Sequence, residues 1–243
     1  MLNKTIDLHQ NDIKGEKKMF NQEIKDMILS LGADVCGIAN ISRFQDAPKG
    51  FSPLDLYSDC KSVITFGVAL SRGLAKVEPR LIYAHYNSHI CSVVDNIALQ
   101  GAKQMETLYP CNALPIPCDS PYEYWDSENM EGRGLISMKH AALLSGLGSI
   151  GKNSLLINPT YGTLLTVGLI LTDMELESDE LSGPMCLEEC TKCIDSCPAG
   201  AIQNGTVIQK LCRMQSFHST SKGYATIDCN TCRVVCPMKF GRR

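Results

Sequence analysis

The residues best suited to chemistry stand in the last quarter of the chain, where two runs of closely spaced cysteines each end in Cys-Pro. The runs are, in order, Cys186, Cys190, Cys193 and Cys197 before Pro198, and Cys229, Cys232 and Cys236 before Pro237. Thiolates are soft ligands for iron, and close spacing lets one loop wrap a core of iron and sulfide. The pattern therefore predicts iron–sulfur clusters.

The spacing resembles the bacterial two-cluster ferredoxin run, in which the last cysteine of each run ligates the other cluster. It departs in two places, because three residues separate Cys186 from Cys190 and because the second run is one ligand short. Cys212 lies between the runs and is the candidate for the missing ligand. The cross-ligation rule then predicts two 4Fe–4S clusters. Their ligands are Cys186, Cys190, Cys193 and Cys236 for one cluster, and Cys197, Cys212, Cys229 and Cys232 for the other.

Two other uses of these cysteines are less favoured. CxxC pairs also hold zinc, although the repeated CxxxCP endings favour clusters. A secreted disulfide framework does not fit, because the start of the chain has no secretory signal and the remainder can bury a large core. Five further cysteines are scattered through the body, and each is expected to be a small buried hydrophobic residue. They are Cys36, Cys60, Cys91, Cys111 and Cys118.

Composition limits the class of protein. The 243 residues are 44% hydrophobic and 20% charged, which suits one main domain and a short cysteine-rich module. A net charge of −3 gives no general attraction to nucleic acid or anionic membranes. The longest apolar run, Leu164 to Leu171, is far shorter than the roughly 20 residues that span a bilayer. We expect a cytoplasmic protein with no membrane partner.

Hydrophobic periodicity predicts the elements that must position the cysteines. Helices are expected over residues 20–31, 80–108 and 135–145, and buried strands over 33–41, 62–70 and 164–172. The segment 112–118 contains two prolines and is expected to be an edge strand or an extended segment. Residues 45–59 and 119–133 are predicted as loops, the second a candidate site loop. Its Tyr122, Tyr124 and Trp125 either stack on a planar ligand or anchor the loop to the core.

A glycine-rich segment, Gly146-Leu-Gly148-Ser149-Ile-Gly151-Lys152-Asn153, matches GxGxxG. That motif binds a dinucleotide when it follows a strand and opens a helix, because the pyrophosphate then sits at the helix N-terminus. Here a helical pattern comes before the glycines and a β-rich run comes after them, which argues against a dinucleotide. Glycines also allow close backbone approach to a flat ligand.

The segment from Lys139 to Ile157, with Tyr161-Gly162 and Leu171-Thr172-Asp173, resembles epoxyqueuosine reductase and its relatives. The cysteine pattern agrees, including the isolated Cys212, and the resemblance covers roughly residues 19–240. It implies base-off cobalamin beside two 4Fe–4S clusters, on a scaffold shared with reductive dehalogenases, with the clusters passing single electrons to cobalt. The glycine-rich segment from Gly146 to Asn153 is then predicted to line the corrinoid pocket, because its glycines allow close backbone approach. It also implies a low-potential electron donor of the ferredoxin or flavodoxin type.

In this family an aspartate in a short Asp-Ser-x-Pro-like segment donates a proton. The nearest match is Asp119-Ser120-Pro121, which lacks the residue before proline, and Asp119 is the candidate general acid. The family also has a helical region after the clusters that helps to hold tRNA, whereas this sequence ends at Arg243. The substrate, a small molecule or a modified nucleoside, is left open, and so is tRNA.

The prediction is an α+β protein in three parts. Residues 1–18 are a disordered lead, 19–180 form a corrinoid-binding-type α/β sandwich domain, and 181–243 form a two-cluster ferredoxin-like module. The predicted function is an epoxyqueuosine-reductase-like oxidoreductase. The alternative is an electron carrier that reduces a partner corrinoid protein or enzyme. The size of the first domain favours the enzyme, because a two-cluster ferredoxin needs no such domain.

Overall fold

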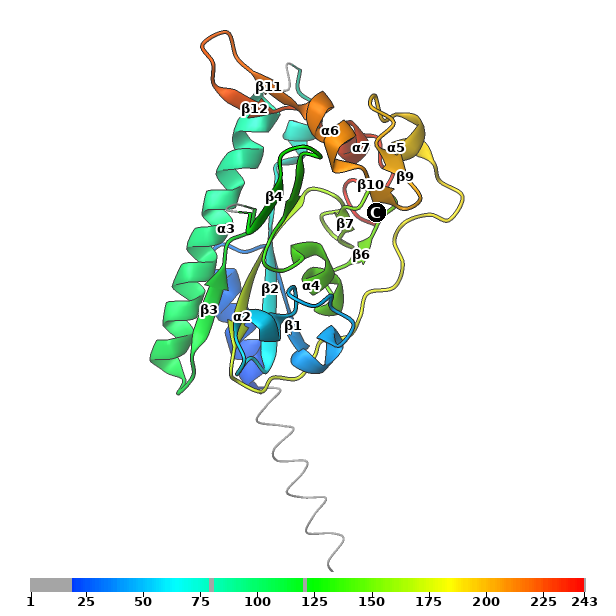
Figure 1. Cartoon of the computed structure of the whole chain (residues 1–243). Helices are drawn as coiled ribbons and strands as arrows, with labels where there is room; N and C mark the ends of the chain where they lie inside the picture. The colour runs from blue at the N-terminus through cyan, green and yellow to red at the C-terminus, as the bar shows by residue number, and fades with distance from the viewer. Residues whose placement is uncertain (1–18, 79–80, 120–121, 243) are drawn as a thin grey trace, which may run out of the picture.

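A four-stranded antiparallel sheet forms the centre of the protein (Figure 1). The computed structural model describes residues 19–78, 81–119 and 122–242, and the predicted disordered lead lies outside them. The strand order is β1-β2-β8-β3. The strands are β1 (Val35–Asn40), β2 (Ser62–Ala69), β8 (Leu165–Thr172) and β3 (Ala113–Ile116). The strands predicted over 33–41, 62–70 and 164–172 are thus confirmed.

The two central strands are covered on both faces. Seven of the eight residues of β2, and all but Thr166 of β8, are buried, which explains their unbroken runs of apolar residues. The predicted edge strand is β3, whose two registered ends, Ala113 and Ile116, lie opposite Thr172 and Leu169 of β8. Pro115 is tolerated there because an edge strand can leave one side of its backbone unpaired.

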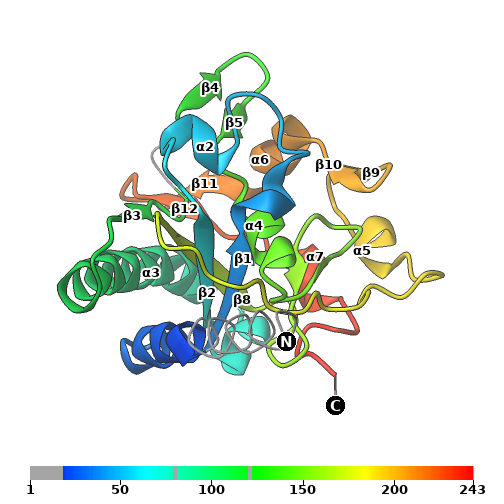
Figure 2. The same cartoon turned by 90° about the horizontal axis from the view of Figure 1, so that it is seen from below.

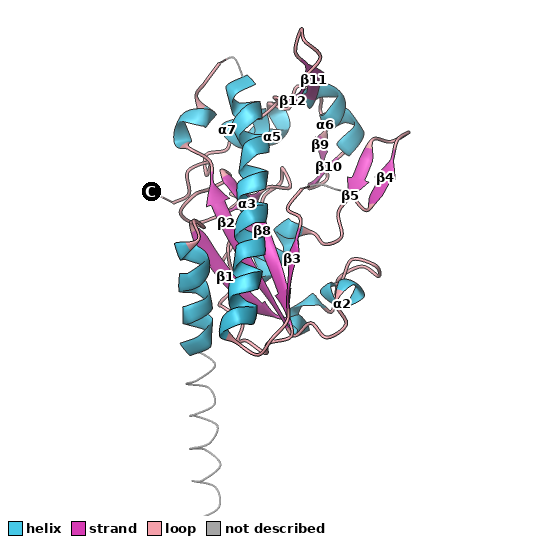
Figure 3. Ribbon diagram, turned by 90° about the vertical axis from the view of Figure 1, so that its left-hand side faces the viewer, coloured by secondary structure: helices cyan, strands magenta, loops and turns pink. Residues whose placement is uncertain are grey.

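Helices cover the two faces of the sheet (Figures 2 and 3). A helix over residues 19–30 and the long helix α3 (Leu81–Leu108) lie on one face, where Ile28, Ile97 and Met105 pack against Phe66 of β2 and neighbouring core residues. Helix α4 (Met138–Leu144) covers the other face through Ala141, which packs with the buried Leu169 and Leu171 of β8. All three helices were predicted from their 3.6-residue period.

After β8 the chain returns along the free edge of β1. The Asp179 side chain accepts a hydrogen bond from Ile38 N (2.8 Å), and Asp179 N donates to Ile38 O (2.8 Å). Lys25 forms an ion pair with the same carboxylate at 2.7 Å. This segment satisfies backbone groups that an exposed edge strand would leave unpaired, and it carries the chain to the first cysteine run.

The remaining elements are short. The first half of the chain contains η1 (Ile41–Phe44), α2 (Pro53–Leu56), η2 (Arg72–Ala75) and the hairpin strands β4 (Tyr124–Asp126) and β5 (Glu131–Arg133), and β6 (Ser149–Ile150) and β7 (Leu156–Ile157) form a second hairpin after α4. The cysteine-rich region contains α5 (Lys192–Asp195), β9 (Ile202–Gln203), β10 (Thr206–Val207), α6 (Gln209–Ser216), β11 (Phe217–Ser219), β12 (Ala225–Ile227) and α7 (Thr231–Val234). The segments predicted as loops at 45–59 and 119–133 therefore contain one short helix and one hairpin.

The α+β class is confirmed, because every ladder of the sheets is antiparallel and the helices lie outside them. Among the described residues, no helix combines the length and the apolar character that crossing a membrane requires.

Candidate metal centre

The glycine-rich segment begins as the C-terminal cap of α4. Gly146 has a φ of +78°, Gly146 N donates to Leu143 O (3.1 Å) and Leu147 N donates to Ala142 O (2.9 Å). This pair of bonds is the Schellman motif, which needs a residue in the left-handed region. The helix therefore ends at this segment, and the short β6–β7 hairpin follows it. The predicted order, with a helix before the glycines and β structure after them, is thus confirmed, and this order argues against a dinucleotide site.

The hairpin is held by close backbone contacts. A side chain on Gly148 would collide with Ile157 O of β7. Ser149 Oγ accepts a hydrogen bond from Met185 N at 2.9 Å, and Ser182 Oγ donates to Gly146 O at 2.6 Å. The chain that leads to the first cysteine run therefore lies directly on this segment.

The tip of the hairpin contacts both cysteine runs. Lys152 Nζ donates to Glu188 O and to Cys190 O, the second at 3.1 Å, and both carbonyls belong to the first run. The Asn153 side chain donates to Cys232 O of the second run at 3.1 Å, and only 4% of Asn153 is exposed. These two adjacent side chains thus join the two loops that were predicted to hold clusters.

The first predicted ligand set lies around one cavity. Its four cysteines, Cys186, Cys190, Cys193 and Cys236, line this cavity together with Lys152 and Asn153. Cys236 comes from the end of the second run, which is the cross-over that the ferredoxin rule predicts. Burial raises the pKa of the Cys236 thiol, and the other three cysteines raise it further because the thiolates repel one another.

The second predicted set is also brought together. Burial raises the pKa of the Cys212 thiol, and the nearby Cys229 and Cys197 raise it further. Burial likewise raises the pKa of Cys232 to about 11, against the opposing effect of Arg233. Cys212, which lies on α6, is therefore close to the other three members, Cys197, Cys229 and Cys232.

The residues present fit iron–sulfur clusters. Thiols are soft ligands for iron, and iron would displace their protons and offset the repulsion between the thiolates. Within the described ranges, no three His, Cys, Asp or Glu side chains converge in the geometry of a site for one metal ion. The role of the eight cysteines as ligands stays a prediction.

The predicted corrinoid-pocket residues already have partners in the chain. Gly146 and Gly148 lie against the backbone of Glu180 and Ile157, Ser149 binds Met185, and Lys152 and Asn153 bind the cysteine loops. These contacts give the segment a second role, which is to hold the cysteine runs. The corrinoid role of the six residues stays a prediction.

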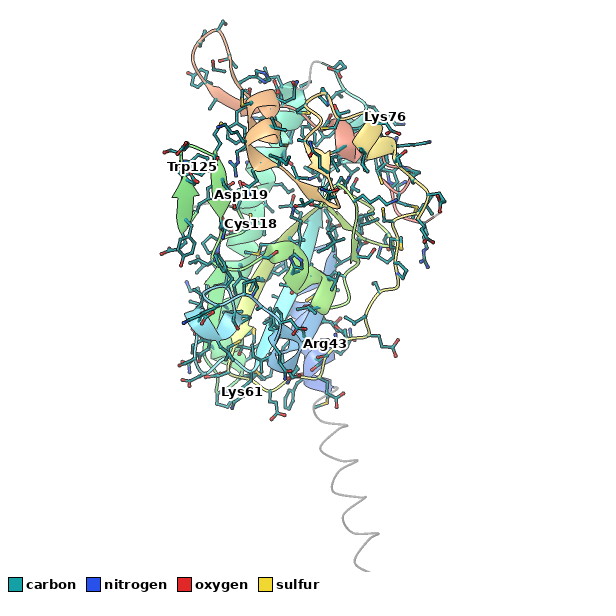
Figure 4. The ribbon with its side chains drawn as sticks, turned by 45° about the vertical axis from the view of Figure 1, so that its right-hand side comes forward. Arg43, Lys61, Lys76, Cys118, Asp119 and Trp125 are labelled. Atoms are coloured by element: carbon teal, nitrogen blue, oxygen red, sulfur yellow. The ribbon has the colours of Figure 1, made fainter. Side chains whose placement is uncertain are left out.

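Asp119 is exposed and lies just after β3, beside helix α3. Cys118 N donates to Asp95 Oδ1 of α3 at 2.9 Å, and Cys118 Sγ donates to Cys91 O at 3.6 Å. The side-chain contact between the two residues lowers the pKa of the Cys91 thiol and, together with burial, raises the pKa of the Cys118 thiol. Cys118, Asp119 and Trp125 lie on one side of the molecule (Figure 4). The other two residues of the Asp-Ser-Pro match lie outside the described residues.

The other scattered cysteines differ from this pair. Burial raises the pKa of Cys36 to about 12 and that of Cys60 to about 11, which suits inert thiols packed in the core. Cys111 is partly buried, and burial raises its pKa as well.

Arg213, which no sequence pattern singled out, joins the site loop to the cysteine-rich region. Its guanidinium lies over the rings of Tyr122 (5.2 Å), Trp125 (5.0 Å) and Phe217 (5.2 Å). Gln209, one turn earlier on α6, accepts from Gly132 N (3.0 Å) and donates to Gly132 O (3.1 Å). Of the two predicted uses of the loop aromatics, these contacts support the anchoring one.

Comparison with known proteins confirms the resemblance. The chain is 30% identical over 134 residues to epoxyqueuosine reductase from Bacillus subtilis and 32% identical over 126 residues to that from Staphylococcus aureus. These matches cover 51% and 47% of this chain but only 34% and 32% of the relatives, so the chain spans about a third of their length. No protein-family model matches.

Solved structures share the fold over most of the chain. Epoxyqueuosine reductase from Streptococcus thermophilus superposes with a TM-score of 0.65 and 19% identity, over 91% of this chain and 66% of that one. A catabolic reductive dehalogenase superposes with a TM-score of 0.66 and 18% identity, over 90% of this chain and 31% of that one. The scaffold is therefore shared between these two classes of protein.

Proposed function

We propose that this chain, a relative of the epoxyqueuosine reductases, is an iron–sulfur oxidoreductase that binds two 4Fe–4S clusters and reduces a small-molecule or modified-nucleoside substrate. The observation that carries the proposal is the convergence of Cys186, Cys190, Cys193 and Cys236 on one cavity, although the first and the last are 50 positions apart in the sequence. Relatives that are reductases give the reaction class.

When bound, the clusters would supply single low-potential electrons, and a corrinoid would deliver them to the substrate. The chain's own residues have separate tasks. Eight cysteine thiolates hold the clusters, and Lys152 and Asn153 fix the two cysteine loops relative to each other. Asp119 holds the proton that the reduced substrate takes up. A low-potential donor of the ferredoxin or flavodoxin type supplies the electrons.

Metal analysis tests the cluster assignment. After anaerobic reconstitution we expect about eight iron and eight sulfide per chain, the content of two 4Fe–4S clusters. Cys212→Ser is expected to lose about half of both, whereas Cys91→Ser, at a partly buried thiol on α3, is expected to keep all. Zinc with no acid-labile sulfide would contradict the assignment.

Corrinoid binding separates the enzyme from an electron carrier that reduces a partner corrinoid protein. The resemblance to a structure whose reaction is described as B12-dependent dehalogenation supports the enzyme. The carrier is favoured by the contacts that occupy Gly148, Lys152 and Asn153. Anaerobic titration with cob(II)alamin, followed by electron paramagnetic resonance, tests this. A bound base-off signal is expected for the enzyme, and an unchanged free signal would select the carrier.

A modified nucleoside is the substrate class to test first. One structural neighbour was solved with an epoxyqueuosine-modified tRNA stem loop, and another has an aspartate on its catalytic loop. We expect Asp119→Asn to lower turnover of such a stem loop by about 10²- to 10⁴-fold, the usual contribution of a general acid, while both clusters remain. Glu123→Gln, an exposed acid on the same loop, is the control. Equal turnover in both variants would exclude Asp119 as the acid.

A further inference from the structure

Two lysines, one on α4 and one in the β6–β7 hairpin, reach toward different parts of the cysteine-rich region. Lys152 belongs to the glycine-rich motif, and Lys139 lies on α4, just after its first residue. Each amino group donates to backbone carbonyls, so each charge has a fixed position. Lys152 Nζ binds Glu188 O and Cys190 O, and Lys139 Nζ binds Ser154 O at 2.6 Å.

Lys152 lies beside the first ligand set. It lines the same cavity as Cys186, Cys190, Cys193 and Cys236, and its carbonyl partners belong to the loop that begins the first run. A cation at this place is close to any charge that the cavity holds. An ammonium is a compact point charge, so its effect depends mainly on distance and solvent exposure.

Lys139 lies beside the second set, because its carbonyl partner Ser154 follows Asn153, whose side chain donates to Cys232 O at 3.1 Å. Burial and Arg233 lower the pKa of its ammonium, while Cys232 and Cys212 oppose this because their thiolates attract the cation. The residue as a whole is exposed. Cys232 and Cys212 belong to the second set, whereas Cys190, whose carbonyl binds Lys152, belongs to the first.

We propose that Lys152 and Lys139 are positioning residues that each set the reduction potential of one cluster, Lys152 for the set that contains Cys190 and Lys139 for the set that contains Cys212. The proposal rests on the proposed function, because it requires both clusters. A cluster gains one negative charge on reduction, so a fixed cation stabilises the reduced form more than the oxidised form. Net charge and hydrogen bonding are among the factors that set such potentials.

The division of the two charges has a consequence for electron flow. If each lysine acts on its own cluster, the difference between the two potentials is adjustable by one substitution at a time. That difference decides which cluster holds the electron. The Asn153 side chain donates to Cys232 O and lines the cavity of the first set. It therefore holds the two cysteine loops together whichever cluster is reduced.

A redox titration monitored by electron paramagnetic resonance tests the proposal on the anaerobically reconstituted full chain. Cys212→Ser assigns the two signals, since it removes a ligand from the second set only. We expect Lys152→Gln to lower the midpoint potential of the first cluster alone, and Lys139→Gln to lower that of the second alone. Lys152→Arg keeps the charge and is expected to stay near the wild-type value.

Lys61→Gln is the matched surface control, because Lys61 is exposed at the far end of the molecule from the cysteine region (Figure 4). Iron and sulfide content, measured on every variant, separates a changed potential from a lost cluster. If Lys152→Gln loses iron, Lys139→Gln tests the same claim at the other cluster.

Three results would overturn the inference. Both glutamine variants could shift the same signal, Lys152→Arg could shift as far as Lys152→Gln, or neither variant could shift a signal while its iron content is intact. A wild-type chain without acid-labile sulfide would instead refute the proposed function itself, and that result appears before any variant is made.

Discussion

Asp173, the last residue of the Leu171-Thr172-Asp173 segment that resembles epoxyqueuosine reductases, has a structural role in the fold. Its carboxylate accepts hydrogen bonds from Asn112 N (2.9 Å), Asn112 Nδ2 (2.7 Å) and Tyr57 Oη (3.0 Å). Burial alone would raise the pKa of this carboxyl, but the hydrogen bonds outweigh burial and lower it. Asp173 thereby ties the end of β8 to the start of β3 and to the end of α2.

This lowered pKa predicts an acid-sensitive contribution to stability. A carboxyl whose pKa is lower in the folded state stabilises the fold fully above its unfolded pKa of about 3.9, and the contribution disappears as the pH falls through the folded value. We expect Asp173→Asn to cost about 1 kcal/mol at pH 7 and to lose less additional stability on acidification than the wild type. Urea denaturation at several pH values measures both, with the exposed Asp46→Asn as control. Parallel pH profiles for the wild type and Asp173→Asn would contradict this.

At the scale of residues, the sequence was sufficient to predict the grouping of the cysteines but not the partners of Lys152 and Asn153. Cysteine spacing reflects the local geometry of a loop around a cluster, so it can be read from one segment. The Lys152 and Asn153 contacts join residues 38 and 79 positions apart, and no local pattern encodes them. The only sign in the sequence was that Lys152 and Asn153 directly follow the last glycine of the motif. That these two side chains bind the cysteine loops became clear only from the fold.

Among the elements, the β4–β5 hairpin is one that the sequence did not predict. Its strands are three residues each, too short for a period-2 pattern to stand out. The hairpin is held from outside by Gln209 and Arg213, which lie about 80 residues further along the chain. The long helix α3 and strand β8 were predictable because their own apolar patterns determine them.

The hairpin gives a site-specific optical measurement, because Trp125 is the only tryptophan in the sequence. The residue is 49% exposed and is partly covered by the Arg213 guanidinium. We expect Arg213→Ala to shift its fluorescence emission to longer wavelength and to speed hydrogen exchange in β4 and β5. Arg213→Lys is expected to rescue little, since an ammonium cannot stack on three rings as a planar guanidinium does.

Lys210→Ala, an exposed residue on the same helix, is the control for this experiment. Emission that is unchanged in Arg213→Ala would show that the cation does not hold the hairpin. The metal content of each variant is compared with the wild type, because Arg213 follows Cys212 directly.

At the scale of the whole molecule, the end of the described chain is locked against its middle. Gly162 has a φ of +60°, and a side chain there would collide with the backbone of Met238 and Lys239. Gly241, with a φ of +79°, lies in the same way against Pro159 and Thr160, and Arg242 N donates to Pro159 O at 2.7 Å. The cysteine-rich segment is thus fastened to the main body after its last cysteine.

This contact predicts that adding one methyl group at Gly162 lowers the stability of the fold. Gly162→Ala combines a strained backbone with a collision, so we expect it to lower the free energy of unfolding by about 1–3 kcal/mol. The melting temperature should fall by about 2–4 °C for each kcal/mol in a chain of this size. Gly223→Ala has the positive φ without close neighbours, and Gly183→Ala has neither. A Gly162→Ala variant no less stable than Gly223→Ala would exclude the collision.

The position of β8 before the first cysteine run also orders events during translation. All four strands of the central sheet, and the β6–β7 hairpin with Lys152 and Asn153, are synthesised before Cys186 leaves the ribosome. Because domains fold from the N-terminal side as they emerge, the receiving surface is complete when the thiols arrive. The cysteines thus emerge after the sheet and the β6–β7 hairpin that they contact, and the backbone contact of Gly241 forms last. Under the proposed function, iron would therefore be delivered late in biogenesis, to a chain whose scaffold is already built.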